Sequence, residues 1–141
     1  LSAILQQAVA DLIHRADRRQ VELILNAPSN AKVRSEPDLL AIVLRNLIDN
    51  AVKYADRPGR VAITVERQSG KTRIIVEDDG PGLSEDEYGR VFEKFVRLGQ
   101  SEEPGAGLGL TITSTLCDRL GISLRRLPPG PLGGLRLELL I

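Results

Sequence analysis

The segment Asn46–Tyr54 (NLIDNAVKY) most constrains how this chain folds, because on a helix it separates an apolar wall from a polar one. At 3.6 residues per turn, Asn46, Asn50 and Lys53 fall within roughly 60° of one another. The apolar side chains cluster on a different face: Leu40, Leu44, Leu47 and Ala51. Asparagine is a weak helix former whose side chain competes for backbone hydrogen bonds. Two asparagines one turn apart in a helix therefore indicate a binding surface, and a phosphate chain with its divalent cation fits these groups.

Length and composition point to one globular domain. The chain has 141 residues, of which 42% are apolar and 27% charged, enough for a core without metal or disulfide. The formal net charge is zero, so no excess of positive charge favours nucleic acid or an anionic membrane as partner. The longest apolar stretch, Leu39–Leu44, is too short to span a bilayer. Because the chain starts at Leu1 and has no methionine, we expect a piece of a larger protein.

Hydrophobic periodicity and turn residues predict the order of the elements. Helices are expected over Leu1–Arg19, between an N-cap at Ser35 and Pro58, and over Leu108–Leu120, with a short helical patch at Ser84–Phe95. Strands are expected over Val21–Leu25, Ala31–Arg34, Arg60–Arg67, Lys71–Glu77, Ile122–Leu127 and Leu135–Ile141. This order predicts an α+β fold, a two-layer sandwich in which a mixed sheet of about five strands carries three helices on one face.

The tripeptide Gly70–Thr72 (GKT) resembles the end of a phosphate-binding P-loop. That loop needs a second glycine five positions before Gly70, where this chain has Val65. Ser69 and Gly70 separate two strands of alternating β-branched residues, so we interpret them as a hairpin turn.

The segment Asp78–Gly82 (DDGPG) follows a predicted strand, so a carboxylate emerges where the backbone becomes glycine-rich. A buried Asp78 there can accept a hydrogen bond from an exocyclic amine such as that of adenine, and glycines let a flat ring approach the backbone. Asp-Gly and Pro-Gly are also turn dipeptides, and taken alone the pattern favours an ordinary strand-ending turn.

The segment Gly105–Leu110 (GAGLGL) opens the last predicted helix. Glycines before a helix expose N–H groups and place the positive end of the helix dipole within reach of an anion. The spacing is not that of a dinucleotide fingerprint, because Leu110 stands where the last glycine would be. The motif indicates phosphate binding, with a flexible loop as the alternative.

Both phenylalanines lie between the two glycine motifs, in Val91–Arg97 (VFEKFVR). We expect them to anchor an otherwise mobile segment to the core. Residues 98–104 are polar and are expected to form a loop that closes over a ligand. Lys94 and Arg97 either reach phosphates from this loop or are solvated charges.

Two conspicuous residues are interpreted as structural. His14 has no second histidine for a metal site and no paired nucleophile, so we expect a surface or partly packed side chain. Cys117, the one cysteine, lies inside the last predicted helix and is expected to be a small core residue.

The succession of these motifs resembles the N, G1, F and G2 boxes of the ATP-binding catalytic domain of bacterial sensor histidine kinases, in the GHKL superfamily. The matching segments are Asn46–Tyr54, Asp78–Gly82, Phe92–Arg97 and Gly105–Leu110. They stand in the family's order and span nearly the whole chain. The resemblance implies a single catalytic domain over residues 1–141, an α/β sandwich that binds ATP between the polar-faced helix and a mobile lid. The sensor and phosphoacceptor domains would be absent.

The resemblance also implies residue roles. Asn50 would ligand Mg²⁺, Asn46 would help to hold the metal–phosphate assembly, and Lys53 would contact phosphate; these three form the catalytic set. Tyr54 would line the nucleoside side, and Asp78, with Gly80 and Gly82 beside it, would accept from the adenine amine. Phosphate donors would be the backbone N–H groups of Gly105, Gly107, Leu108 and Gly109, with Lys94 and Arg97 as further contacts.

One position separates a kinase from the hydrolytic ATPases of the same superfamily. Those ATPases carry a water-activating glutamate four residues before the metal-binding asparagine, where this chain has Asn46. Asp49 points roughly 100° away from Asn50. We therefore expect ATP to be held for transfer to a histidine of the dimerisation domain rather than hydrolysed quickly. His14 lacks the acceptor's His-Glu-x-x-x-Pro context, so the fragment is expected to bind ATP–Mg²⁺ without autophosphorylation.

Two alternatives stay open: a hydrolytic ATPase module, and a non-catalytic nucleotide-sensing module with a decayed lid. For the kinase, the implied partners are the dimerisation domain of the same kinase and, indirectly, a response regulator, without nucleic acid. The fragment is expected to be soluble and monomeric. The family implies a cytoplasmic domain whose parent is anchored in the bacterial inner membrane.

Overall fold

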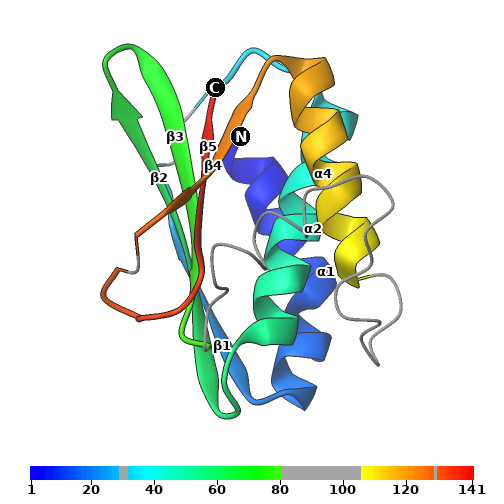
Figure 1. Cartoon of the computed structure of the whole chain (residues 1–141), viewed down its shortest axis with the longest axis vertical. Helices are drawn as coiled ribbons and strands as arrows, with labels where there is room; N and C mark the ends of the chain where they lie inside the picture. Colours follow the sequence, from blue (N-terminus) through cyan, green and yellow to red (C-terminus); the bar gives the residue numbers. More distant parts are fainter. Residues whose placement is uncertain (29–31, 81–105, 129) are drawn as a thin grey trace.

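The computed structural model describes residues 1–28, 32–80, 106–128 and 130–141, with the backbone alone for 106–111. Figure 1 shows two layers, a five-stranded sheet and three helices packed on one of its faces. The elements are α1 (Ser2–Arg18), β1 (Val21–Asn26), α2 (Pro37–Tyr54), β2 (Gly59–Gln68), β3 (Lys71–Asp78), α4 (Ala106–Leu120), β4 (Ser123–Leu127) and β5 (Arg136–Leu140). The predicted α+β sandwich with a mixed sheet is confirmed. Within the described ranges, no helix is both long and apolar enough to cross a membrane.

The strand order in the sheet is β1-β2-β3-β5-β4. β1 and β2 are parallel, which requires a crossover, and α2 provides it. The other neighbouring pairs are antiparallel. Ser69 and Gly70 join β2 to β3 with φ of 53° and 80°, as a two-residue hairpin turn demands. The tripeptide Gly70–Thr72 therefore belongs to a hairpin, as predicted.

The core lies between the helices and the sheet. α1 buries Leu5, Ala8, Leu12 and Ala16, and the wall of α2 predicted from the sequence, Leu40, Leu44, Leu47 and Ala51, is buried as well. They pack with inward-facing strand residues such as Ile63, Ile74 and Leu139. Full burial of each leucine or isoleucine stabilises the fold by roughly 1.5–3 kcal/mol. Because this wall fixes the rotation of α2 about its axis, it also fixes where the polar side of α2 points.

Two local predictions are wrong. Lys32–Arg34, in the segment expected to be a strand, forms no strand; Ala31 lies outside the described residues. Both edges of the nearby strand β3 are already paired, with β2 and β5, and the segment is joined to β3 by Thr72 Oγ1, which donates to the Lys32 carbonyl at 3.3 Å. The N-cap of α2 is Glu36 and not Ser35. Pro37, with its fixed φ, starts the helix at the next residue, and no side chain caps it.

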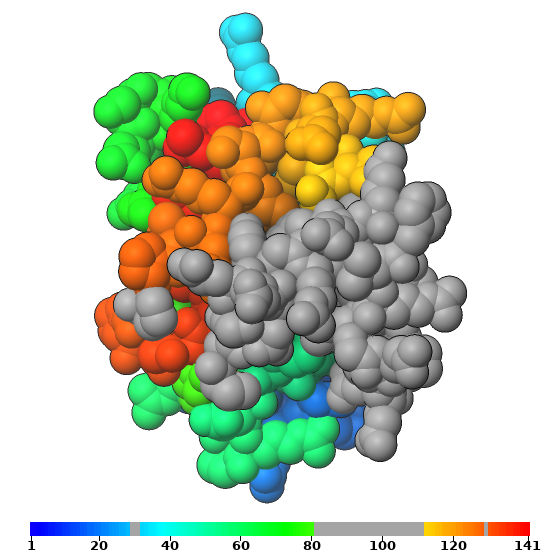
Figure 2. Space-filling model, in the orientation of Figure 1, coloured from blue at the N-terminus to red at the C-terminus, as the bar shows by residue number. Residues whose placement is uncertain are grey.

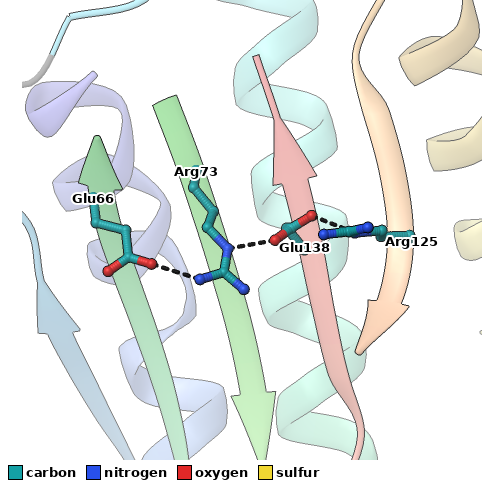
Figure 3. A network of polar contacts seen from close by, with 4 residues as sticks. All are labelled: Glu66, Arg73, Arg125 and Glu138. Carbon is teal, nitrogen blue, oxygen red and sulfur yellow. Dashed lines mark hydrogen bonds and ion pairs between the residues drawn. The ribbon is translucent and has the colours of Figure 1, made fainter. Parts of the chain in front are cut away.

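The sheet face away from the helices carries a row of alternating charges, shown in Figure 3. Arg73 on β3 contacts Glu66 on β2 at 2.7 Å and also Glu138 on β5, while Arg125 on β4 contacts Glu138 at 2.6 Å. Burial disfavours ionisation of Glu138, whose side chain is 1% exposed, but the two arginines hold its pKa below its ordinary value. The ion pairs thus link four strands on a face that no described helix covers.

Candidate functional site

The polar side of α2 places its asparagines where the core meets the solvent. Asn50 is 6% exposed and Asn46 is half-buried. Within the described part of the chain, no group forms a hydrogen bond with the Asn50 side chain. The amide of a buried asparagine is a polar group that requires a hydrogen-bond partner, which a ligand or a neighbouring segment can supply.

Lys53 lies one turn beyond Asn50 near the end of α2. Its amine is 3.5 Å from Asp49 Oδ2, and the same carboxylate contacts Arg15 of α1. The Lys53 side chain is 23% exposed, so it is partly accessible to solvent on the polar side of α2. Tyr54 is half-buried and is the last residue of α2.

Asp78 ends β3 and is 1% exposed, so its carboxylate is buried. Its Oδ1 accepts hydrogen bonds from the backbone N–H groups of Gly80 at 2.9 Å and Leu135 at 3.2 Å. Among the described residues, the printed donors reach Oδ1 and none reaches Oδ2. Burial raises the pKa of Asp78 to about 6, although the two N–H groups act in the opposite direction. The side chain is therefore a fixed acceptor at the end of a strand.

Close backbone contacts bring the ends of β3 and α2 together. A Cβ atom at Gly80 would overlap the carbonyl oxygen of Tyr54, so only glycine fits there. Asp79 accepts hydrogen bonds from the backbone N–H groups of Asp56 at 3.2 Å and Arg60 at 3.0 Å, which ties the turn after α2 to the end of β3. Asp78 and the polar side of α2 are consequently held as neighbours.

Gly134 and Asp79 support the site but were not predicted from the sequence. The Gly134 N–H donates to the Asp78 carbonyl at 3.0 Å, and a Cβ at Gly134 would overlap the Asp78 carboxylate. The signal for Gly134 is the pair Gly133-Gly134 directly before the last strand. Asp79 is marked only by its place beside Asp78, and its bonds to the turn after α2 depend on the tertiary fold.

α4 packs on α2 and runs antiparallel to it, so its first turn points toward the C-terminal part of α2 (Figure 1). The helix begins at Ala106, two residues before the predicted start at Leu108. Gly107, Leu108 and Gly109 therefore lie within its first turn and not ahead of it. The first N–H groups of a helix have no partner within the helix, so these three positions still offer backbone donors to an anion.

Four predicted site residues lie outside the described residues: Gly82, Lys94, Arg97 and Gly105. The predicted helical patch at Ser84–Phe95 and the lid at residues 98–104 also lie there. His14 is exposed and Cys117 is buried, as predicted. Burial raises the pKa of the Cys117 thiol to about 12, so it is unreactive. Figure 2 shows the β2–β3 turn at the opposite end of the molecule from the end of α2, which excludes Gly70–Thr72 from the site.

Comparison with known proteins identifies the family. Residues 35–140 match the family described as "Histidine kinase-, DNA gyrase B-, and HSP90-like ATPase". The chain belongs to this ATPase family. It is 33% identical over 120 residues to the swarming motility regulation sensor protein RssA of Serratia marcescens, which covers 84% of this chain and 26% of RssA. The chain spans about a quarter of the length of the curated relatives that it matches.

Solved structures agree with this assignment. The structure of full-length ShkA in complex with AMPPNP is 31% identical, with a TM-score of 0.78 over 98% of this chain and 28% of that one. The mycobacterial sensor histidine kinase MprB, at 24% identity, supports the fold with a TM-score of 0.85 over 99% of this chain and 93% of that one. This chain is thus an ATP-binding catalytic module of the histidine kinase type, as the resemblance implied.

The raised pKa of Asp78 predicts a specific pH dependence of stability. Its pKa rises from 3.8 to about 6 on folding, so the folded state binds a proton more tightly than the unfolded state. The contribution of Asp78 to the free energy of unfolding should therefore fall, by up to about 3 kcal/mol, as the pH rises from about 4 to about 6. In Asp78→Asn, Oδ1 can keep both N–H bonds and no charge is buried, so this contribution disappears. Urea unfolding of both proteins across this range measures the difference, and parallel pH curves would contradict the assignment.

Proposed function

We propose that residues 1–141 form a single catalytic domain that binds ATP–Mg²⁺ and donates the γ-phosphoryl group to a histidine on the dimerisation domain of the same sensor kinase. One observation carries the proposal: a buried amide side chain, Asn50, and a buried carboxylate, Asp78, that two backbone N–H groups fix through Oδ1, lie on adjoining ends of α2 and β3. The family match supports ATP as the ligand of this site.

The adenine end of the site is built around Asp78. The N–H groups of Gly80 and Leu135 fix its carboxylate through Oδ1, so Oδ2 can accept from the exocyclic amine of adenine. Gly80 has no side chain to keep a flat ring away from the backbone. Tyr54, whose carbonyl lies against Gly80, lines the nucleoside side. By resemblance, Gly82 shapes the same pocket.

The phosphate end is built from α2 and the start of α4. Mg²⁺ prefers oxygen ligands and keeps several waters, so the Asn50 carboxamide oxygen with phosphates and water is a suitable set. Asn46 helps to hold this assembly and Lys53 contacts a phosphate. The N–H groups of Gly107, Leu108 and Gly109 add donors at the positive end of the α4 dipole. By resemblance, Gly105, Lys94 and Arg97 complete the set. When bound, Mg²⁺ neutralises phosphate charge.

Phosphoryl transfer requires positioning and charge neutralisation more than acid–base chemistry. An imidazole nitrogen of the acceptor histidine forms a bond to the γ-phosphorus while the bond to the β–γ bridging oxygen breaks, and ADP leaves. Asn46 cannot take a proton from water, so this chain has no base where the hydrolytic relatives of the superfamily carry a glutamate. This residue favours a kinase over a hydrolytic ATPase.

The setting follows from the resemblance. The matching relatives are named sensor proteins, and we infer that the module works with the dimerisation domain of its own kinase and indirectly with a response regulator. We place it on the cytoplasmic side of a parent anchored in the bacterial inner membrane. The isolated fragment is expected to be soluble and monomeric.

Calorimetric titration with ATP tests the site. Asn50→Ala should lose the magnesium-dependent part of the affinity, by tenfold or more, about 1.4 kcal/mol. Asp78→Asn should lose binding with and without magnesium, because an amide N–H₂ would face the adenine amine. Asn26→Ala, an exposed asparagine at the end of β1, is the matched control and should bind as the wild type does. Equal magnesium-dependent binding by Asn50→Ala would refute the metal assignment.

Incubation with ATP labelled in the γ-phosphate separates the kinase from its alternatives. The chain alone should acquire no label, His14 included, because it holds no acceptor in the right context. Adding the parent's dimerisation domain as a separate chain should place label on the histidine of that domain. Steady-state phosphate release of order 1 s⁻¹, a rate typical of enzymes, would favour the hydrolytic ATPase. Binding with neither transfer nor hydrolysis would favour the nucleotide-sensing module.

A further inference from the structure

An ion cluster joins α1 to the end of α2 beside the proposed phosphate site. Arg15 of α1 contacts Asp49 through Oδ1, and Lys53 lies 3.5 Å from Oδ2 of the same carboxylate. The Asp49 side chain is 21% exposed. Directly after α1, the guanidinium of Arg19, the C-cap residue of this helix, donates to the Lys53 carbonyl at 3.1 Å. Arg15 of α1 and Arg19 therefore hold the segment of α2 that carries Lys53.

Around the axis of α2, Lys53 lies between Asp49, which is anionic, and Asn50, beside which the proposed function places a phosphate. Lys53 is about 40° around the helix from Asp49 on one side and about 60° from Asn50 on the other. Its amine is thus within reach of the Asp49 carboxylate and, under the proposed function, of a phosphate held near Asn50. Without a neutralising partner, the Asp49 carboxylate would attract the Lys53 amine and repel the triphosphate. Both electrostatic interactions are strong at separations of a few ångströms.

Arg15 is placed to remove this competition. Its guanidinium is always charged and forms a charge-assisted contact with the carboxylate. The contact between Lys53 and Asp49, at 3.5 Å, is longer than the 2.7–2.9 Å usual for charge-assisted hydrogen bonds, so the amine is the more weakly held partner. Arg15 therefore carries most of the neutralisation of Asp49.

We propose that Arg15 is a positioning residue of the ATP site: by neutralising Asp49 across the α1–α2 interface, it leaves Lys53 available to a phosphate of ATP. The inference rests on the proposed function, because it assumes that Lys53 contacts phosphate. It assigns α1 a role in binding although Arg15 itself belongs to neither the polar side of α2 nor the end of β3. A displacement of α1 would change the affinity for ATP through the same contact.

A comparison of ATP with adenosine tests the inference in the full chain. Arg15→Ala should raise the Kd for ATP–Mg²⁺ roughly two- to fivefold, the range expected for a partly exposed ion pair, and leave the Kd for adenosine unchanged. Arg15→Lys should restore part of the loss. Arg18→Ala removes the same charge from an exposed position on α1 and should bind ATP as the wild type does. An equal loss for adenosine would show that Arg15 merely supports the fold and would overturn the proposal.

The double variant Arg15→Ala/Asp49→Asn separates the two explanations. If the loss of Arg15 damages the fold, the weaker binding of ATP persists in the double variant. If Arg15 acts through the charge of Asp49, removing that charge should return the ATP affinity to within about twofold of the wild type. A double variant that binds as weakly as Arg15→Ala would overturn the proposal. The failures are distinguishable: a wild type that binds no ATP contradicts the proposed function itself. A wild type that binds ATP, with an unaffected Arg15→Ala, contradicts only this inference.

Discussion

The candidate site depends on two hydrogen bonds that backbone N–H groups donate to the Asp78 carboxylate. Gly80 follows Asp78 in the chain, whereas Leu135 precedes β5, so one side chain joins the end of β3 to the approach of the neighbouring strand. Glycine at positions 80 and 134 is what allows the backbone to come this close. The same arrangement buries a carboxylate, which costs stability. Under the proposed function, this carboxylate gives the site its specificity for a hydrogen-bond donor.

α2 serves the core and the site at once. Its apolar wall packs against the sheet and so fixes the rotation of the helix about its axis. The asparagines and Lys53 therefore lie on the side of α2 that does not face the core. The end of the helix is then fixed from two directions, by Arg19 directly after α1 and by Asp79 after β3 through the adjoining turn. The core therefore holds the polar side of α2 in place, which is the surface that we propose binds phosphate.

The sequence predicted those features of the fold that depend on residues close together in the chain. The wall of α2, the hairpin at Ser69 and Gly70, and the five-stranded sandwich follow from periodicity and turn chemistry, and the structure has them. Lys32–Arg34, in the segment expected to be a strand, forms none, since both edges of the nearby strand β3 are taken by β2 and β5, and no sequence pattern records this pairing. The contact between Arg15 and Asp49 and the approach of Gly134 to Asp78 join distant segments, so only the fold reveals them. The residue roles came from the order of the motifs, since each motif alone also fitted a turn, a loop or a solvated surface.

The central claim is that the polar side of α2, the end of β3 and the first turn of α4 bind one triphosphate nucleotide together. A titration of the ¹⁵N-labelled chain with ATP–Mg²⁺, followed by backbone amide shifts, tests it most directly. We expect the amide signals of Asn50, Asp78, Gly80 and Gly107 to shift together along one saturation curve, while those of Arg73 and Glu138 on the far face of the sheet stay unchanged. Shifts confined to one of these three segments, or separate curves for α2 and α4, would contradict a shared site.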